Sequence, residues 1–144
     1  MAPPPEMAAL AAFVGTWRTE GEIVDGRGAP VARLLATDRY EWLGGGRFLV
    51  HHVDGRMGDE PVQALEVIGW DAERRRYQTQ AFDAAGATRW EAMLAQGRWT
   101  IQGETERFTG TFTADGRALD GTWEQRGEDG AWRRWMTLRL TRAD

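Results

Sequence analysis

Residues 13–24, FVGTWRTEGEIV, contain the opening that decides the fold of this chain. An apolar, helix-like stretch ends at Phe13, and a run of alternating apolar and polar side chains begins with Gly15-Thr16-Trp17. A period of two is typical of a strand that buries one face. About nine or ten such runs follow one another, each stopped by a glycine-containing turn. This order predicts an all-β fold, a single antiparallel up-and-down β-barrel of about 8–10 strands with a short N-terminal helix.

The turn signals divide the chain into elements but leave no linker for a second domain. Residues 1–5 are expected to form a disordered tail, and residues 6–13 two helical turns with one apolar side. Residues 54–61 are expected to be the longest loop, and residues 6–144 to form one barrel domain. The expected strands are 16–24, 31–43, 47–53, 62–70, 76–82, 88–94, 98–104, 107–113, 119–126 and 132–141.

The composition excludes several classes of site. The chain of 144 residues contains no cysteine and no serine, and all eighteen basic residues are arginine. Disulfides, thiolate or serine nucleophiles, lysine Schiff bases and the lysine of a phosphate-binding loop are therefore impossible. No spacing of ligand residues matches a zinc site, so we expect no metal, and the function favoured below needs no cofactor.

The charge distribution bears on possible partners. The net charge is −4, and the only run of arginines, Arg74-Arg75-Arg76, falls in a predicted turn. A chain without a basic stripe is a poor candidate for nucleic-acid binding. The apolar stretch at residues 7–14 is far shorter than the roughly 20 residues that span a bilayer, and no basic residue precedes it as in a secretory signal. We therefore expect a cytoplasmic protein that contacts neither nucleic acid nor membrane.

The alternation also predicts which side chains point into the barrel. The inward face is rich in aromatic rings, which either fill the interior or line a cavity for a small apolar or aromatic molecule. Gly21, Gly110 and Gly121 either remove volume between these rings or mark bends in the strands. The candidate ligand-binding residues are Trp17, Tyr40, Trp42, Tyr77, Trp90, Trp99, Trp123, Arg134 and Met136.

Arg134 is the charged residue among these candidates, because it shares the face of Met136 in the last strand. A buried guanidinium is costly unless it is paired, so Arg134 would bind either Glu66 or a carboxylate of the ligand. Alternatively, Arg134 lies near the barrel mouth and reaches solvent along its aliphatic stem. Trp135, on the opposite face, would be an exposed aromatic ring, which favours a homodimer.

His51 and His52 are the only histidines, and adjacent residues of a strand point to opposite faces. They cannot both bind one metal ion from a regular strand, and the alternation does not decide which of them points inward. The inward imidazole could be a general base, an axial haem ligand or a hydrogen-bonded structural group. The candidate catalytic residues are His52, His51, Glu66 and Tyr77.

Several motifs in a fixed order carry a resemblance to a known family. They are Phe13-Val14-Gly15-Thr16-Trp17, Gly46-Arg47-Phe48-Leu49, Ile68-Gly69-Trp70-Asp71, Phe82-Asp83-Ala84-Ala85-Gly86, Arg107-Phe108-Thr109-Gly110-Thr111-Phe112, Asp115-Gly116, Gly121-Thr122-Trp123-Glu124 and Leu140-Thr141-Arg142. From about Leu10 onward, the chain resembles an uncharacterised bacterial lipocalin-like family of the calycin superfamily. The resemblance implies a barrel in which Trp17 packs across the floor. It implies no particular activity, because the family has no established common one. The haem-binding nitrobindins are more distant relatives by architecture, but their longer glycine-rich opening and C-terminal haem-ligating histidine are not matched here.

Three functions are compatible with these observations. The first is binding of a small hydrophobic or aromatic molecule in an aromatic-lined cavity. The second is a cofactor-independent enzyme of cyclase or isomerase type, in which the inward histidine, Glu66 or Tyr77 supplies acid–base help. The third is a nitrobindin-like protein that binds haem or nitric oxide.

Overall fold

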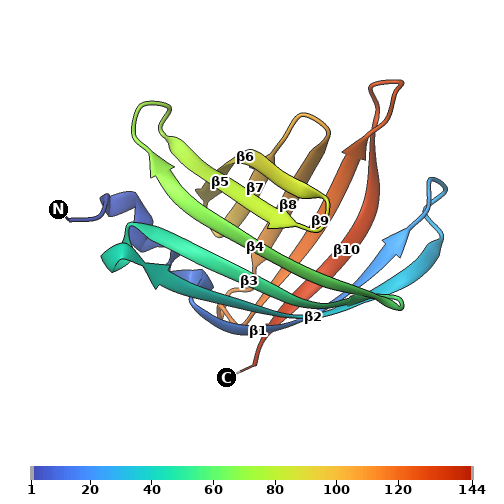
Figure 1. Cartoon of the computed structure of the whole chain (residues 1–144), viewed down its shortest axis with the longest axis horizontal. Coiled ribbons are helices and arrows are strands. Elements are labelled where there is room, and N and C mark those ends of the chain that lie inside the picture. The colour runs from blue at the N-terminus through green and yellow to red at the C-terminus, as the bar shows by residue number, and fades with distance from the viewer. Residues whose placement is uncertain (1, 144) are drawn as a thin grey trace.

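Ten strands close into one antiparallel barrel in the computed structural model of the chain, which describes residues 2–143 (Figure 1). Each strand pairs with its neighbours in the sequence, and β1 pairs with β10 to close the sheet. The predicted up-and-down barrel with a short N-terminal helix is confirmed. The elements are η1 (Pro5–Phe13), β1 (Gly15–Val24), β2 (Pro30–Leu43), η2 (Gly44–Gly46), β3 (Phe48–Met57), β4 (Glu60–Asp71), β5 (Arg76–Asp83), β6 (Gly86–Ala95), β7 (Arg98–Gln102), β8 (Glu106–Phe112), β9 (Ala118–Arg126) and β10 (Trp132–Arg142).

Strands β3 and β4 run further than their sequence predicts. β3 continues to Met57 and β4 begins at Glu60, so a two-residue turn replaces the long loop expected at residues 54–61. Gly55 explains the difference. In the sequence it is typical of a turn, but in the structure it lies within β3, where it allows close contact with β2. A Cβ atom added there would lie 2.2 Å from the carbonyl oxygen of Leu35 on β2. Glycine at this position therefore lets β2 and β3 approach each other within the sheet.

The N-terminal helix closes one end of the barrel, beside the turn between β2 and β3 (Figure 1). η1 is a 3₁₀ helix that buries Met7, Leu10 and Phe13, the side chains of its predicted apolar side. It begins at Pro5, and Met1 of the expected tail lies outside the described residues. Within residues 2–143, no helix has the length and apolar character needed to cross a membrane.

Three side chains from the strands hold η1 against the barrel. Trp17 donates its indole N–H to the carbonyl oxygen of Phe13 at 2.8 Å, and the hydroxyl of Tyr77 donates to the carbonyl oxygen of Glu6 at 2.7 Å. The guanidinium of Arg142 lies 4.1 Å from the centre of a Trp17 ring and donates to two carbonyls at the C-terminal end of the helix. The bonds from Trp17 and Arg142 satisfy carbonyl groups that the C-terminal end of a helix leaves unpaired. The contacts with η1 also fix Trp17 and Tyr77 in the barrel floor.

A bulge in β10 reverses the face predicted for the first part of that strand. The pairing of β10 with β9 shifts between Arg134 and Met136, which leaves Trp135 as an extra residue. Arg134 therefore lies opposite Glu124 and is exposed, so the prediction that it points inward is wrong. Trp135 is partly buried against a cluster that contains Leu34 and Met136. It is not the exposed ring on which the expectation of a dimer rested.

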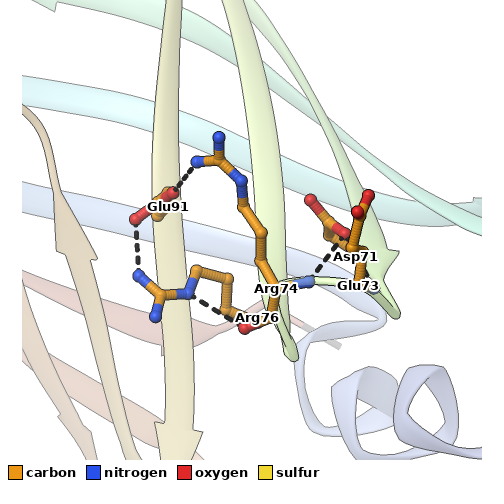
Figure 2. A network of polar contacts seen from close by, with 5 residues as sticks. All are labelled: Asp71, Glu73, Arg74, Arg76 and Glu91. Atoms are coloured by element: carbon orange, nitrogen blue, oxygen red, sulfur yellow. Dashed lines mark hydrogen bonds and ion pairs between the residues drawn. The ribbon is translucent and has the colours of Figure 1, made fainter.

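The arginine run before β5 forms a surface ion network in the predicted turn (Figure 2). Arg74 and Arg76 each donate to one carboxylate oxygen of Glu91 at 2.7 Å. The carboxylate of Asp71 accepts hydrogen bonds from the backbone N–H groups of Glu73 and Arg74, both at 3.1 Å. The hydrogen bonds from the two guanidinium groups lower the pKa of Glu91. Part of the positive charge of this run is thus paired within the chain.

Candidate functional site

A cavity of about 210 Å³ lies inside the barrel. Every strand contributes at least one residue to its wall, and Phe13 of η1 lines it as well. Met57, Val62 and Asp83 line the part of the cavity next to the β3–β4 and β5–β6 turns. None of these three side chains is buried, and Asp83 is exposed. The cavity therefore opens at this end of the barrel, while η1 covers the other end.

Aromatic rings form much of the cavity wall. The rings of Trp90 and Trp123 have their centres 5.6 Å apart, and the ring of Phe108 lies 5.1 Å from Trp123. Five of the predicted ligand-binding residues line the cavity, namely Tyr40, Trp90, Trp99, Trp123 and Met136. The other four lie elsewhere, with Trp17 and Tyr77 in the floor, Trp42 37% exposed near the end of β2, and Arg134 on the outside.

The glycines predicted on the inward face have two different roles. A Cβ atom would lie 2.4 Å from Phe108 Cζ if added at Gly121, and 2.7 Å from Phe108 Cε2 if added at Gly110. These two glycines therefore provide the space that the Phe108 ring occupies. At Gly21 a Cβ atom would instead lie 2.5 Å from the carbonyl oxygen of Thr137, so this glycine allows β1 and β10 to approach. The first predicted alternative, removal of volume beside a ring, thus occurs at Gly110 and Gly121, whereas Gly21 serves contact between strands.

One polar cluster interrupts the apolar wall. His51 on β3 is the cross-strand neighbour of Tyr40 on β2 and of Glu66 on β4. Its Nε2 atom lies 2.5 Å from Oδ2 of Asp38, and its Nδ1 atom lies 3.0 Å from Oε1 of Glu66. The hydroxyl of Thr19 donates to Oδ1 of Asp38 at 2.6 Å. Because residues two apart in a strand share a face, Asp38 and Tyr40 point to the same interior.

The two carboxylates in contact with His51 favour its imidazolium form. Ionised carboxylates only accept hydrogen bonds, so both ring nitrogens must donate. Burial lowers the pKa of His51, but the hydrogen bonds to Asp38 and Glu66 and the charges of these carboxylates raise it more, to about 9 from 6.5. Burial and the same two charges raise the pKa of Tyr40, whose ring stacks on the imidazole at 4.0 Å. With two carboxylates around one imidazolium, the cluster has a net charge of minus one.

Glu66 has the carboxylate oxygen of this cluster that is free to accept a hydrogen bond. Both oxygens of Asp38 are occupied, whereas Oε2 of Glu66 has no hydrogen-bond partner among the described residues. The Glu66 side chain is only 12% exposed and lines the cavity. No arginine is present among the described residues of the wall. A bound molecule would therefore meet a carboxylate oxygen rather than a guanidinium. Of the alternatives for Arg134, pairing with Glu66 does not occur, because Arg134 lies on the outside.

The cluster is not arranged to hold a metal or haem. Its two carboxylates lie on opposite nitrogens of one ring, and residues 2–143 contain no group of acidic, histidine or cysteine side chains that could hold a metal ion. An axial haem ligand needs a free ring nitrogen, which His51 lacks. His52 points to the outside and pairs with the exposed Glu41 at 3.0 Å. The residues of the barrel interior thus do not fit haem.

The structure brings together only some of the candidate catalytic residues. His51 and Glu66 are in contact in the cavity wall, whereas His52 is outside and Tyr77 binds η1. Asp38, the buried partner of His51, is not among the residues predicted from the sequence. The signal was available, because an aspartate at this position shares the apolar face of β2 with Leu34 and Tyr40.

Comparisons with known proteins identify a family and a fold. A family model described as a protein of unknown function (DUF1579) matches residues 2–139. Among solved structures, the crystal structure of Rv2717c from M. tuberculosis is similar to this chain, with a TM-score of 0.71, 13% sequence identity and coverage of 99% of both chains. At that identity the likeness shows the barrel fold alone. No curated protein matches the chain.

Proposed function

The chain belongs to the DUF1579 family of proteins of unknown function, and from this premise we propose that it binds a small apolar or aromatic molecule inside a lipocalin-like barrel. The observation that carries the proposal is the internal cavity of about 210 Å³. Ligand sites are typically concave and mostly apolar, with a few polar groups that orient the ligand. Here the indole rings supply the apolar wall, and the cluster around His51 supplies the polar group.

The size of the cavity favours one class of ligand. An engineered apolar cavity of roughly 150 Å³ in another protein admits benzene. A volume of about 210 Å³ is therefore suited to one aromatic ring with a short side chain. A fatty acid or a haem group would need the barrel to widen.

The enzyme alternative is less well supported by the geometry of the cluster. A general acid or base needs a ring nitrogen or carboxylate oxygen within reach of the substrate. Both nitrogens of His51 are held by carboxylates, so the histidine has no free position toward the cavity. Oε2 of Glu66 is the only oxygen of the two carboxylates without a partner among the described residues. This oxygen could accept a proton, but the cluster has no second free group among the described residues to return it, whereas one acceptor is enough to orient a bound ligand.

A tryptophan-fluorescence titration with 2-phenylethanol tests the proposal. Binding is expected to change the emission saturably, because Trp90, Trp99 and Trp123 line the cavity. Ala81→Leu adds three carbon atoms to the wall and is expected to weaken binding at least tenfold. Ala87→Leu is the matched control, because Ala87 is exposed on the adjacent strand. Absence of saturable binding, or equal affinity in both variants, would contradict an internal site.

A further inference from the structure

We propose that the ligand carries a protonated amine and that the carboxylate of Glu66 binds it through Oε2. This inference rests on the proposed function, because it names the polar end of the molecule that the cavity takes. The juxtaposition that carries it is an unpaired carboxylate oxygen, on a side chain that is only 12% exposed, beside a wall of aromatic rings.

The charge of the cluster around His51 favours a cationic ligand. The imidazolium of His51 offsets only one of the two carboxylates that it contacts, so Asp38 and Glu66 leave one negative charge uncompensated. Asp83 adds a further carboxylate at the mouth of the cavity. A buried charge without a partner is unfavourable, because the interior solvates it less well than water does. A cation bound in the cavity would remove this penalty, whereas a carboxylate on the ligand would increase it.

The hydrogen bonds within the cluster leave an acceptor for a donor on the ligand. Asp38 is buried, and each of its oxygens already accepts a hydrogen bond, one from Thr19 and the other from His51. Glu66 contributes only Oε1 to His51 and leaves Oε2 without a partner among residues 2–143. An ammonium group carries three donors and no acceptor, which matches a carboxylate oxygen. Charge-assisted hydrogen bonds of this type are stronger than bonds between neutral groups.

The aromatic rings in the rest of the wall also suit a cation. Cations interact favourably with the faces of tryptophan and tyrosine rings, and aromatic cages for ammonium groups use this attraction. Tyr40 stacks on His51, and Trp90, Trp99 and Trp123 line the same cavity. No guanidinium group competes for the carboxylate from within the described wall, because Arg134 lies on the outside. The cavity therefore combines apolar surface for a ring with one negative acceptor for an amine.

Three probes with the same ring and similar length separate the alternatives. Titration calorimetry at pH 7 would compare 2-phenylethylamine, 2-phenylethanol and phenylacetate with the full chain. We expect the amine to bind at least tenfold more tightly than the alcohol, and phenylacetate to bind most weakly. Equal affinity of amine and alcohol, or tightest binding of phenylacetate, would overturn this inference but leave the proposed function standing. If none of the three binds, the proposed function itself fails.

Glu66→Gln assigns the effect to one residue. The amide keeps the size of the side chain and an oxygen that can accept from His51, but it removes the charge. The preference for amine over alcohol is expected to fall below threefold. Glu41→Gln is the matched control, because Glu41 pairs with the outward His52, and it should keep the full preference. A tenfold preference for the amine that survives in Glu66→Gln would overturn the assignment of the amine site to Glu66. The comparison of the three probes on the unaltered chain tests the preference for a cation without any variant.

Discussion

Deprotonation of His51 is expected to destabilise the barrel at alkaline pH. The pKa of its imidazole is about 9 in the folded chain, against an ordinary 6.5 in an unfolded one. Because the folded value is the higher one, the stabilisation is complete below pH 6.5 and disappears as the pH rises through about 9. At 1.36 kcal/mol for each tenfold change in proton affinity, the interval between these values corresponds to about 3 kcal/mol. This is a large part of the roughly 5–15 kcal/mol that stabilises a typical domain.

Urea unfolding followed by tryptophan fluorescence between pH 6 and pH 9.5 measures this loss. The free energy of unfolding of the natural chain is expected to fall by about 3 kcal/mol over this interval. His52→Gln should keep the same pH dependence, because His52 is outside the cavity, whereas His51→Gln should lose it. An NMR titration of the ring should give a midpoint near 9 for His51. A midpoint near 6.5, or an equal slope in His51→Gln, would refute the reasoning.

Three further substitutions test the packing around the site. Arg142→Met removes the cation over the Trp17 ring and two hydrogen bonds to the helix, and it is expected to lower the free energy of unfolding by about 2–4 kcal/mol in urea titrations; a loss below about 0.5 kcal/mol would contradict the role given to it. Gly121→Ala places a Cβ atom 2.4 Å from Phe108 Cζ and should lower the free energy of unfolding by about 1–3 kcal/mol in the same titrations. An unchanged free energy would show that the Phe108 ring moves freely and would contradict this packing. Thr19→Val leaves a buried carboxylate oxygen without its donor and should cost about 1–3 kcal/mol at pH 7 in thermal unfolding, whereas unchanged stability would show that water replaces the hydroxyl.

The fold could be predicted because local alternation and turn chemistry act strand by strand. The alternation of side chains along each strand correctly predicts the inward positions of Trp17, Tyr40 and Trp99, which are buried. It fails in β10, because one extra residue at Trp135 shifts the pairing and turns Arg134 outward. A bulge of this kind depends on the partner strand, so the sequence of β10 alone does not reveal it.

The site could be predicted only in part, because its geometry depends on cross-strand register. The sequence identifies His51 and Glu66 as candidates but does not show that they are opposite each other in β3 and β4. It likewise does not show that Asp38 is near enough to take the second ring nitrogen. These contacts link three strands, and their distances follow from the closure of the sheet. The one local indication of the cluster is Asp38, a charged residue on the apolar face of β2.

An NMR titration with 2-phenylethylamine can locate the ligand through the indole N–H signals of the eight tryptophans. A ligand inside the barrel should shift the signals of Trp90, Trp99 and Trp123, which line the cavity. The signals of Trp17, which is held in the floor, and of Trp42, which is 37% exposed near the end of β2, should stay in place. Saturable shifts confined to Trp42, or three unchanged cavity signals at high ligand concentration, would contradict binding within the barrel.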